Sequence, residues 1–217
     1  MEKPLPPKTP DPLARADGEE AASSTPRIAI ICLIGGALLL AVFAWRRQQE
    51  HSRGGKHHPA VGKEYLPREL PPLTATEPIT AADLRGKVTL INFWGWWCGP
   101  CQVEFPHMLE LEQSLRNNPD FRFVSVATSG DPESDESDPR LKDETQAFLT
   151  ERNAPIVTYK DPLAAEQKRL VELSGSSQSG VPLTVVIDKQ GIIRGFWLGY
   201  LPGDELSMRE VIDAALK

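Results

Sequence analysis

Cysteine and histidine are scarce in this chain: only three of its 217 residues are cysteine and only four are histidine. Two of the cysteines, Cys98 and Cys101, stand two residues apart, and no second pair with that spacing occurs. A structural zinc centre needs four ligands, so this pair cannot form one by itself. We therefore expect no metal site and no bound cofactor.

Basic residues are also outnumbered, because 24 of them stand against 30 acidic residues. The excess lies after residue 62, since residues 63–217 carry 16 basic and 24 acidic side chains, a net charge of −8. Seven of these acids lie in the stretch 130–144, GDPESDESDPRLKDE. We interpret this stretch as a solvated surface insertion, with a docking loop for a basic partner as the alternative. Proteins that bind nucleic acid present basic surfaces, so we expect no nucleic-acid partner.

Long apolar runs are absent except for one. Residues 28–45, IAIICLIGGALLLAVFAW, carry no charge over 18 positions. A helix of that length extends about 27 Å, close to the roughly 30 Å hydrocarbon core of a bilayer. We therefore predict a single transmembrane helix over 28–45, with Cys32 as a small side chain within the membrane. A cleaved signal peptide is the alternative, which the long and slightly acidic leader disfavours.

The segments on either side of this run have no apolar periodicity. Residues 1–27 contain six prolines and charges of both signs, which predicts a disordered tail. Residues 46–62 have a net charge of +3 and are predicted to form a juxtamembrane linker that contacts anionic lipid. Four basic residues follow the run within this linker, and by the positive-inside rule they favour a cytoplasmic C-terminal domain.

The remaining residues, 63–217, show the pattern of one α/β domain. The continuous apolar run KVTLINF at 87–93 predicts a central strand that is buried on both faces. Apolar residues recur at helical spacing between residues 103 and 115, and Asn117-Asn118-Pro119 would stop this helix. Together with the strand-like FRFVSVA at 121–127, it completes a parallel strand–helix–strand unit. Further along we expect helices over 145–152, 162–173 and 204–216, a short strand over 156–159, and a hairpin of strands 183–187 and 192–197.

The cysteine pair lies where the predicted central strand ends and the next helix begins. A disulfide across so short a loop would restrict little of the unfolded chain's entropy, so a structural role has a weak physical basis. A redox role is better supported, because unpaired N–H groups and the helix dipole stabilise a thiolate at a helix N-terminus. Cys98 would attack a partner's disulfide, and Cys101, one turn further on, would resolve the mixed disulfide.

The sequence around the pair, LINFWGWWCGPCQVEFP, resembles the active site of thioredoxin-fold oxidoreductases. The C-x-x-C-x-x-E-x-P form, an inserted strand, helix and strand, and the late Val181-Pro182 followed by LTVVID resemble the membrane-anchored TlpA-like branch. That branch includes the cytochrome c biogenesis thiol reductases. The resemblance covers Gly62 to the C-terminus and implies a thioredoxin-like fold over 63–217, with a central mixed β-sheet flanked by helices. It also implies a redox disulfide between Cys98 and Cys101.

The resemblance further implies which residues meet a substrate peptide. The set comprises Trp97, Gly99, Pro100, Val181 and Pro182, and a cis peptide bond would precede Pro182.

Proton transfer is a separate question, because thioredoxin has an aspartate where this chain has Asn92, which cannot exchange a proton. The resemblance implies that Glu104 shifts the pKa of Cys101 or accepts its proton. Water is the other candidate for the proton acceptor. The alternative for Glu104 is a solvated residue on the helix surface, without a role in the reaction. Trp94 and Trp96 fit either the core or the rim of the substrate site.

Together these features predict a membrane-tethered thiol–disulfide oxidoreductase. The Gly-Pro dipeptide between the cysteines resembles that of thioredoxin and favours reduction of substrates. The implied partners are disulfide-containing extracytoplasmic proteins such as apocytochrome c, an integral-membrane electron donor and membrane lipid. We expect the C-terminal domain on the periplasmic side in spite of the basic linker, because long domains cross membranes largely regardless of loop charge. A copper-delivery protein and a non-catalytic scaffold of the same fold are the alternatives.

Overall fold

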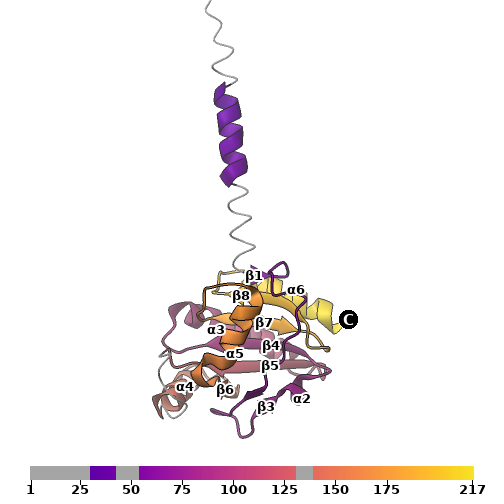
Figure 1. The fold of residues 1–217 in the computed structure, drawn as a ribbon. Helices are drawn as coiled ribbons and strands as arrows, with labels where there is room; N and C mark the ends of the chain where they lie inside the picture. The colour runs from indigo at the N-terminus through magenta and orange to yellow at the C-terminus, as the bar shows by residue number, and fades with distance from the viewer. Residues whose placement is uncertain (1–29, 43–53, 131–138) are drawn as a thin grey trace, which may run out of the picture. The chain divides into compact units, whose positions relative to one another are not determined.

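The computed structural model describes residues 30–42, 54–130 and 139–217 (Figure 1). The chain divides into two compact units, 1–46 and 47–217. In the first unit, residues 30–42 form a helix. No helix in the described ranges is both long enough and apolar enough to cross a membrane. The predicted span 28–45 continues past this helix at both ends, and the predicted tail 1–27 lies outside the described residues.

A six-stranded mixed sheet forms the centre of the second unit, in the order β1-β8-β7-β4-β5-β6 (Figure 1). Its strands are β1 (Gly54–Gly55), β4 (Val88–Trp94), β5 (Phe121–Ala127), β6 (Thr158–Lys160), β7 (Leu183–Ile187) and β8 (Ile193–Leu198). Strand β4 pairs in parallel with β5 and antiparallel with β7. All seven residues of β4 are buried, as its mostly apolar, β-branched sequence predicts. The expected α/β class with a central mixed sheet is confirmed.

Helices and short elements cover both faces of this sheet. They are β2 (Glu69–Leu70), β3 (Ile79–Thr80), α2 (Ala81–Leu84), α3 (Gly99–Leu115), α4 (Pro139–Glu151), the 3-10 helix η1 (Pro162–Ala164), α5 (Ala165–Ser174) and α6 (Asp204–Leu216). Successive side chains of β4 point to opposite faces and so enter different cores. Leu90 packs with Met108 of α3 and Ile212 of α6, whereas Ile91 packs with Leu170 of α5.

A third core lies at the end of β4 that leads into α3. Trp94, the last residue of β4, packs there with the cysteine pair and with Phe148 of α4. Helix α4 begins at Pro139, earlier than the predicted residue 145, because the acidic sequence that precedes it carries no apolar signal. Residues 131–138 of the acidic insertion lie outside the described residues, so the two interpretations of that stretch are left as predictions.

In the second unit, regular structure already occurs before Lys63, where the sequence pattern places the start of the domain. Gly54 and Gly55 form β1, which pairs with the outer strand β8. The backbones approach closely, since a Cβ on Gly54 would lie 2.7 Å from the carbonyl oxygen of Phe196. His58 is buried and its ring stacks on Phe196 with centroids 4.2 Å apart. The last residues of the predicted linker 46–62 are therefore part of the folded domain, through glycine and histidine contacts that apolar patterning does not reveal.

Candidate active site

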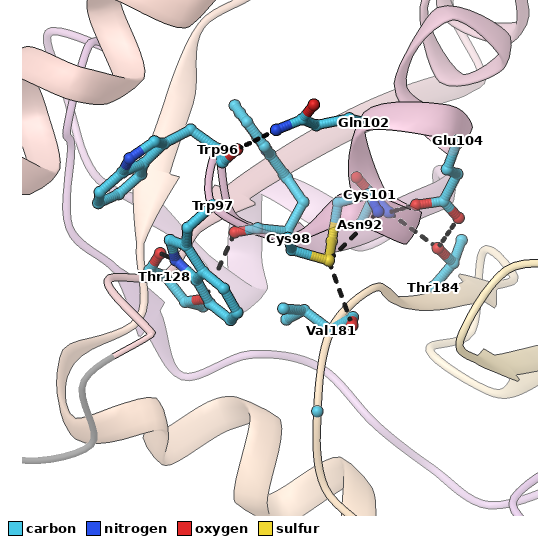
Figure 2. The surroundings of a disulfide bond; sticks show 12 residues. Asn92, Trp96, Trp97, Cys98, Cys101, Gln102, Glu104, Thr128, Val181 and Thr184 are labelled. Atoms are coloured by element: carbon cyan, nitrogen blue, oxygen red, sulfur yellow. Dashed lines mark hydrogen bonds between the residues drawn. A yellow bond between two sulfur atoms is a disulfide. The ribbon is translucent and has the colours of Figure 1, made fainter.

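Cys98 and Cys101 form a disulfide at the N-terminus of α3 (Figure 2). Cys98 is the N-cap residue of the helix, and its sulfur accepts a hydrogen bond from the backbone N–H of Cys101 at 3.2 Å. Gly99 and Pro100 form the first turn, where a missing backbone donor has no cost. The same N–H group and the helix dipole would stabilise a thiolate on Cys98 once the disulfide is reduced.

The two sulfur-bearing residues differ in their exposure to solvent. Cys98 is 5% exposed and Cys101 is 1% exposed, so only Cys98 offers an edge to another molecule. A substrate must therefore come close to the surface around Cys98, and the groups that form this surface decide what can bind.

One side of this surface is the segment Gly180–Pro182, which leads into β7. The Val181–Pro182 peptide bond is cis, as expected from the resemblance. The carbonyl oxygen of Val181 lies 3.4 Å from the sulfur of Cys98 (Figure 2). The structure thus brings Cys98 and Val181, 83 positions apart in the sequence, into direct contact.

Trp97 forms the other side and is 46% exposed, although it is a large aromatic residue. Its indole N–H donates a hydrogen bond to the carbonyl oxygen of Thr128 at 3.0 Å (Figure 2). Gly95 and Gly130 lie against the ring, because a Cβ on either residue would come within 2.5 Å of it. The ring is therefore fixed in place while part of it stays open to solvent, which suits a platform for an apolar or peptide group.

The two remaining tryptophans of the FWGWW sequence differ in their surroundings. Trp94 is 1% exposed, donates a hydrogen bond from its indole N–H to the hydroxyl oxygen of Ser125 at 2.8 Å, and belongs to the core. Trp96 is partly buried against the same core, and its backbone carbonyl accepts a hydrogen bond from Gln102. The sequence left both residues open between core and rim, and the structure places Trp94 in the core.

Glu104 lies in α3, one turn after Cys101, and its side chain is buried rather than solvated. Its carboxylate accepts hydrogen bonds from the Asn92 amide at 2.9 Å and from the Thr184 hydroxyl at 3.0 Å (Figure 2). The Asn92 amide also donates to the Thr184 hydroxyl at 2.9 Å. Burial raises the pKa of Glu104 from 4.5 to about 7, against the opposing effect of these hydrogen bonds. A carboxyl group with this pKa can release or accept a proton at neutral pH.

Sequence reasoning did not identify Thr184 as part of the site. It lies two residues after Pro182, and in the sheet it is the direct partner of Asn92 across β4 and β7. The only signal available beforehand was a hydroxyl residue within the otherwise apolar strand LTVVI.

Among the described residues, no cluster of three or more histidine, cysteine, aspartate or glutamate side chains is placed to bind a metal ion.

The fold and the site together define the class of the protein. A dithiol pair that caps a helix after the central strand, with one sulfur reachable and the other covered, is the arrangement that thioredoxin-like proteins use to exchange disulfides. The chain is a thiol–disulfide oxidoreductase of the thioredoxin-like class.

Comparison with known proteins gives the particular family. The Redoxin family model matches residues 60–216, and the chain belongs to this family. It is 34% identical over 150 residues to the thiol:disulfide interchange protein HelX of Rhodobacter capsulatus, covering 69% of this chain and 74% of HelX. It is 30% identical over 154 residues to the thiol:disulfide interchange protein DsbE of Pseudomonas fluorescens, covering 71% of this chain and 74% of that protein.

A solved structure shows the same fold. The crystal structure of a putative thiol:disulfide interchange protein DsbE from Chlorobium tepidum matches with a TM-score of 0.57 and 25% sequence identity. The match covers 72% of this chain and 98% of that protein. These relatives are consistent with the TlpA-like branch to which the sequence points.

Proposed function

We propose that the protein reduces disulfides in extracytoplasmic proteins, apocytochrome c among them, while it is tethered to a membrane by residues 28–45. The observation that carries this proposal is the Cys98–Cys101 disulfide, whose Cys98 sulfur lies against the backbone carbonyl of Val181 and next in sequence to Trp97, which has an exposed ring. An extended peptide can lie across this surface, pair with the backbone of Val181 and bring its own disulfide to Cys98. The similarity to proteins named for thiol:disulfide interchange supports the same chemistry.

The reaction proceeds in two exchanges. In the reduced enzyme, the Cys98 thiolate attacks one sulfur of the substrate disulfide, and the other substrate sulfur leaves as a thiolate. Cys101 then attacks the sulfur of Cys98, which releases the second substrate thiol and forms the Cys98–Cys101 disulfide seen in the structure. The substrate gains two electrons from the two cysteines and two protons, of which the Cys101 thiol gives up one and the solvent supplies the other.

Glu104 takes the proton of the Cys101 thiol in this scheme. Burial prevents easy access of bulk water to Cys101, and Glu104, one turn further along α3, has a pKa near neutrality. Asn92 and Thr184 orient the carboxylate through their hydrogen bonds. The oxidised enzyme then needs two electrons from a donor, for which an integral-membrane dithiol relay has the required chemistry.

The first test uses a Cys101→Ser variant of the full chain in cells. Without the resolving thiol, Cys98 should remain joined to its substrates, and the mixed disulfides can be isolated and identified under non-reducing conditions. A Cys98→Ser variant is the control and should trap nothing. If Cys101→Ser traps no protein with a disulfide or paired thiols, the proposed reaction is wrong.

The direction and location of the reaction need two further measurements. A reduction potential near that of thioredoxin, about −270 mV, supports a reductase. A potential near the oxidising end of the range, about −120 mV, would mean that the protein oxidises its substrates instead. A topology reporter fused after Lys217 should be active on the periplasmic side. Activity only in the cytoplasm would refute the proposed location.

A further inference from the structure

The segment Gly180–Pro182 next to Cys98 is held on both sides by hydrogen bonds to the protein. The carbonyl oxygen of Gly180 accepts a hydrogen bond from the side-chain amide of Gln167 at 2.6 Å. The carbonyl oxygen of Pro182 accepts one from the backbone N–H of Gly199 at 2.8 Å. Val181, between these two fixed points, is the residue whose carbonyl oxygen faces the sulfur.

Gln167 is itself fixed by the start of α5. The carboxylate of Asp161 accepts hydrogen bonds from the backbone N–H groups of Glu166 at 2.9 Å and Gln167 at 2.8 Å. Asp161 and Gln167 are 7% and 8% exposed, so water competes little for these groups. The turn between Asp161 and Glu166 contains Leu163 and Ala164, both with φ of 52°, a conformation that non-glycine residues keep only where surrounding contacts determine it.

A second set of contacts fixes α5 against the segment that precedes β4. The carboxylate of Glu166 accepts hydrogen bonds from the Tyr65 hydroxyl at 3.2 Å and from the backbone N–H of Arg68 at 3.4 Å. It also forms an ion pair with Arg169. Because α5 is tied down at its first turn, the side-chain amide of Gln167 reaches Gly180 from a rigid support.

We propose that Gln167 is a positioning residue for the substrate, which acts by fixing the Gly180 carbonyl so that Val181 presents its backbone at a set distance from Cys98. This inference rests on the proposed function, in which the substrate peptide pairs with Val181. Gly180 itself is exposed, so water can replace Gln167 as the hydrogen-bond donor if the side chain is changed. The fold therefore does not depend on this hydrogen bond. The position of Val181 does depend on it, because a water molecule, unlike a side chain anchored on α5, does not hold the Gly180 carbonyl at one place.

The test compares a peptide disulfide with a small one. A Gln167→Met variant of the full chain keeps the side-chain volume and loses the donor. Its kcat/KM for reduction of insulin should fall about fivefold to tenfold, mainly through a higher KM, as the loss of one hydrogen bond that orders the site predicts. Its rate with hydroxyethyl disulfide, which has no peptide backbone to pair with Val181, should stay within about twofold of wild type.

The matched control is Ser174→Ala, which removes hydrogen bonds at the other end of the same helix. It should leave both rates unchanged, and thermal unfolding should show that both variants are folded. A Gln167→Glu variant, which cannot donate while it is ionised, should show the same selective loss as Gln167→Met and is the second test should that variant not fold.

Two results would overturn the inference. Equal slowing with insulin and hydroxyethyl disulfide would mean that Gln167 acts on the cysteine pair and not on the substrate, and unchanged insulin kinetics would mean that it positions nothing. If wild-type protein exchanges with hydroxyethyl disulfide but fails to reduce any peptide disulfide, the proposed function fails, and this inference fails with it.

Discussion

Replacing Glu104 with glutamine should make the free energy of unfolding less dependent on pH. The wild-type carboxyl group is buried among Asn92, Thr184 and the core, and it has a pKa of about 7 in the folded state against 4.5 ordinarily. Glutamine has nearly the same shape and does not ionise. Its oxygen can accept from Asn92, and its amide can donate to the Thr184 hydroxyl, so the variant is expected to fold.

The sign and size follow from the two pKa values. Below about pH 4.5 the carboxyl group is neutral in both states and has no pH-dependent effect. Between pH 4.5 and 7 the folded state binds more protons than the unfolded state, so the wild type loses stability as the pH rises. One pKa unit corresponds to about 1.4 kcal/mol, so the shift of Glu104 amounts to about 3 kcal/mol, fully lost above pH 7.

The measurement is urea unfolding, followed by tryptophan fluorescence, of oxidised wild type and Glu104→Gln at pH 4 and pH 8. The free energy of unfolding of the variant, relative to wild type, should be higher at pH 8 than at pH 4 by about 3 kcal/mol. Any change in hydrogen bonding that does not depend on pH cancels in this comparison. Glu110→Gln, which alters an exposed carboxylate of the same helix, is the control and should show no comparable difference. If Glu104→Gln shows the same relative stability at both pH values, the buried carboxyl group does not titrate as described.

Two further substitutions test the surroundings of the cysteine pair. In Gly130→Ala the new Cβ would meet the ring of Trp97 at 2.5 Å, so insulin reduction should slow severalfold. Gly175→Ala is the control, because Gly175 has a similar positive φ and nothing lies near its Cβ. It should lower the free energy of unfolding by about 1 kcal/mol and leave the rate of insulin reduction unchanged. Equal rates in the two variants would argue against a role for Trp97. Phe148→Ala should lower the free energy of unfolding by about 3 to 5 kcal/mol, because the Phe148 ring packs on Trp94 with ring centroids 5.0 Å apart. A loss below about 1 kcal/mol in denaturant unfolding would contradict this packing.

Features with a local cause were predictable from the sequence. The strand predicted at 87–93 from an apolar run is β4, 88–94, and the helix predicted between the cysteine pair and Asn117-Asn118-Pro119 is α3, 99–115. Helix boundaries set by weak signals were less accurate: the predicted helix 162–173 is a 3-10 turn followed by α5, because Leu163 and Ala164 adopt positive φ. Nothing in those two residue types indicates such a conformation.

The candidate site also combines features that were predictable from the sequence with features that were not. The cysteines, the Gly-Pro dipeptide and the late Val-Pro were recognisable as a pattern, and the cis peptide bond before Pro182 is confirmed. The burial of Glu104 and its hydrogen bond from Thr184 were not predictable, because 80 positions separate the two residues. Likewise, 13 positions and a loop separate Gln167 from Gly180, and no periodicity connects them.

The sequence by itself determined that a thiol pair lies between a buried strand and a helix, because both the strand and the helix start are encoded by neighbouring residues. Only the tertiary structure decided which groups surround that pair. The antiparallel register of β4 and β7 sets Asn92 opposite Thr184, and α3 packs Glu104 against both. Removal from water then raises the pKa of Glu104 to a value at which it can exchange protons, and burial of this kind exists only once the elements have packed together.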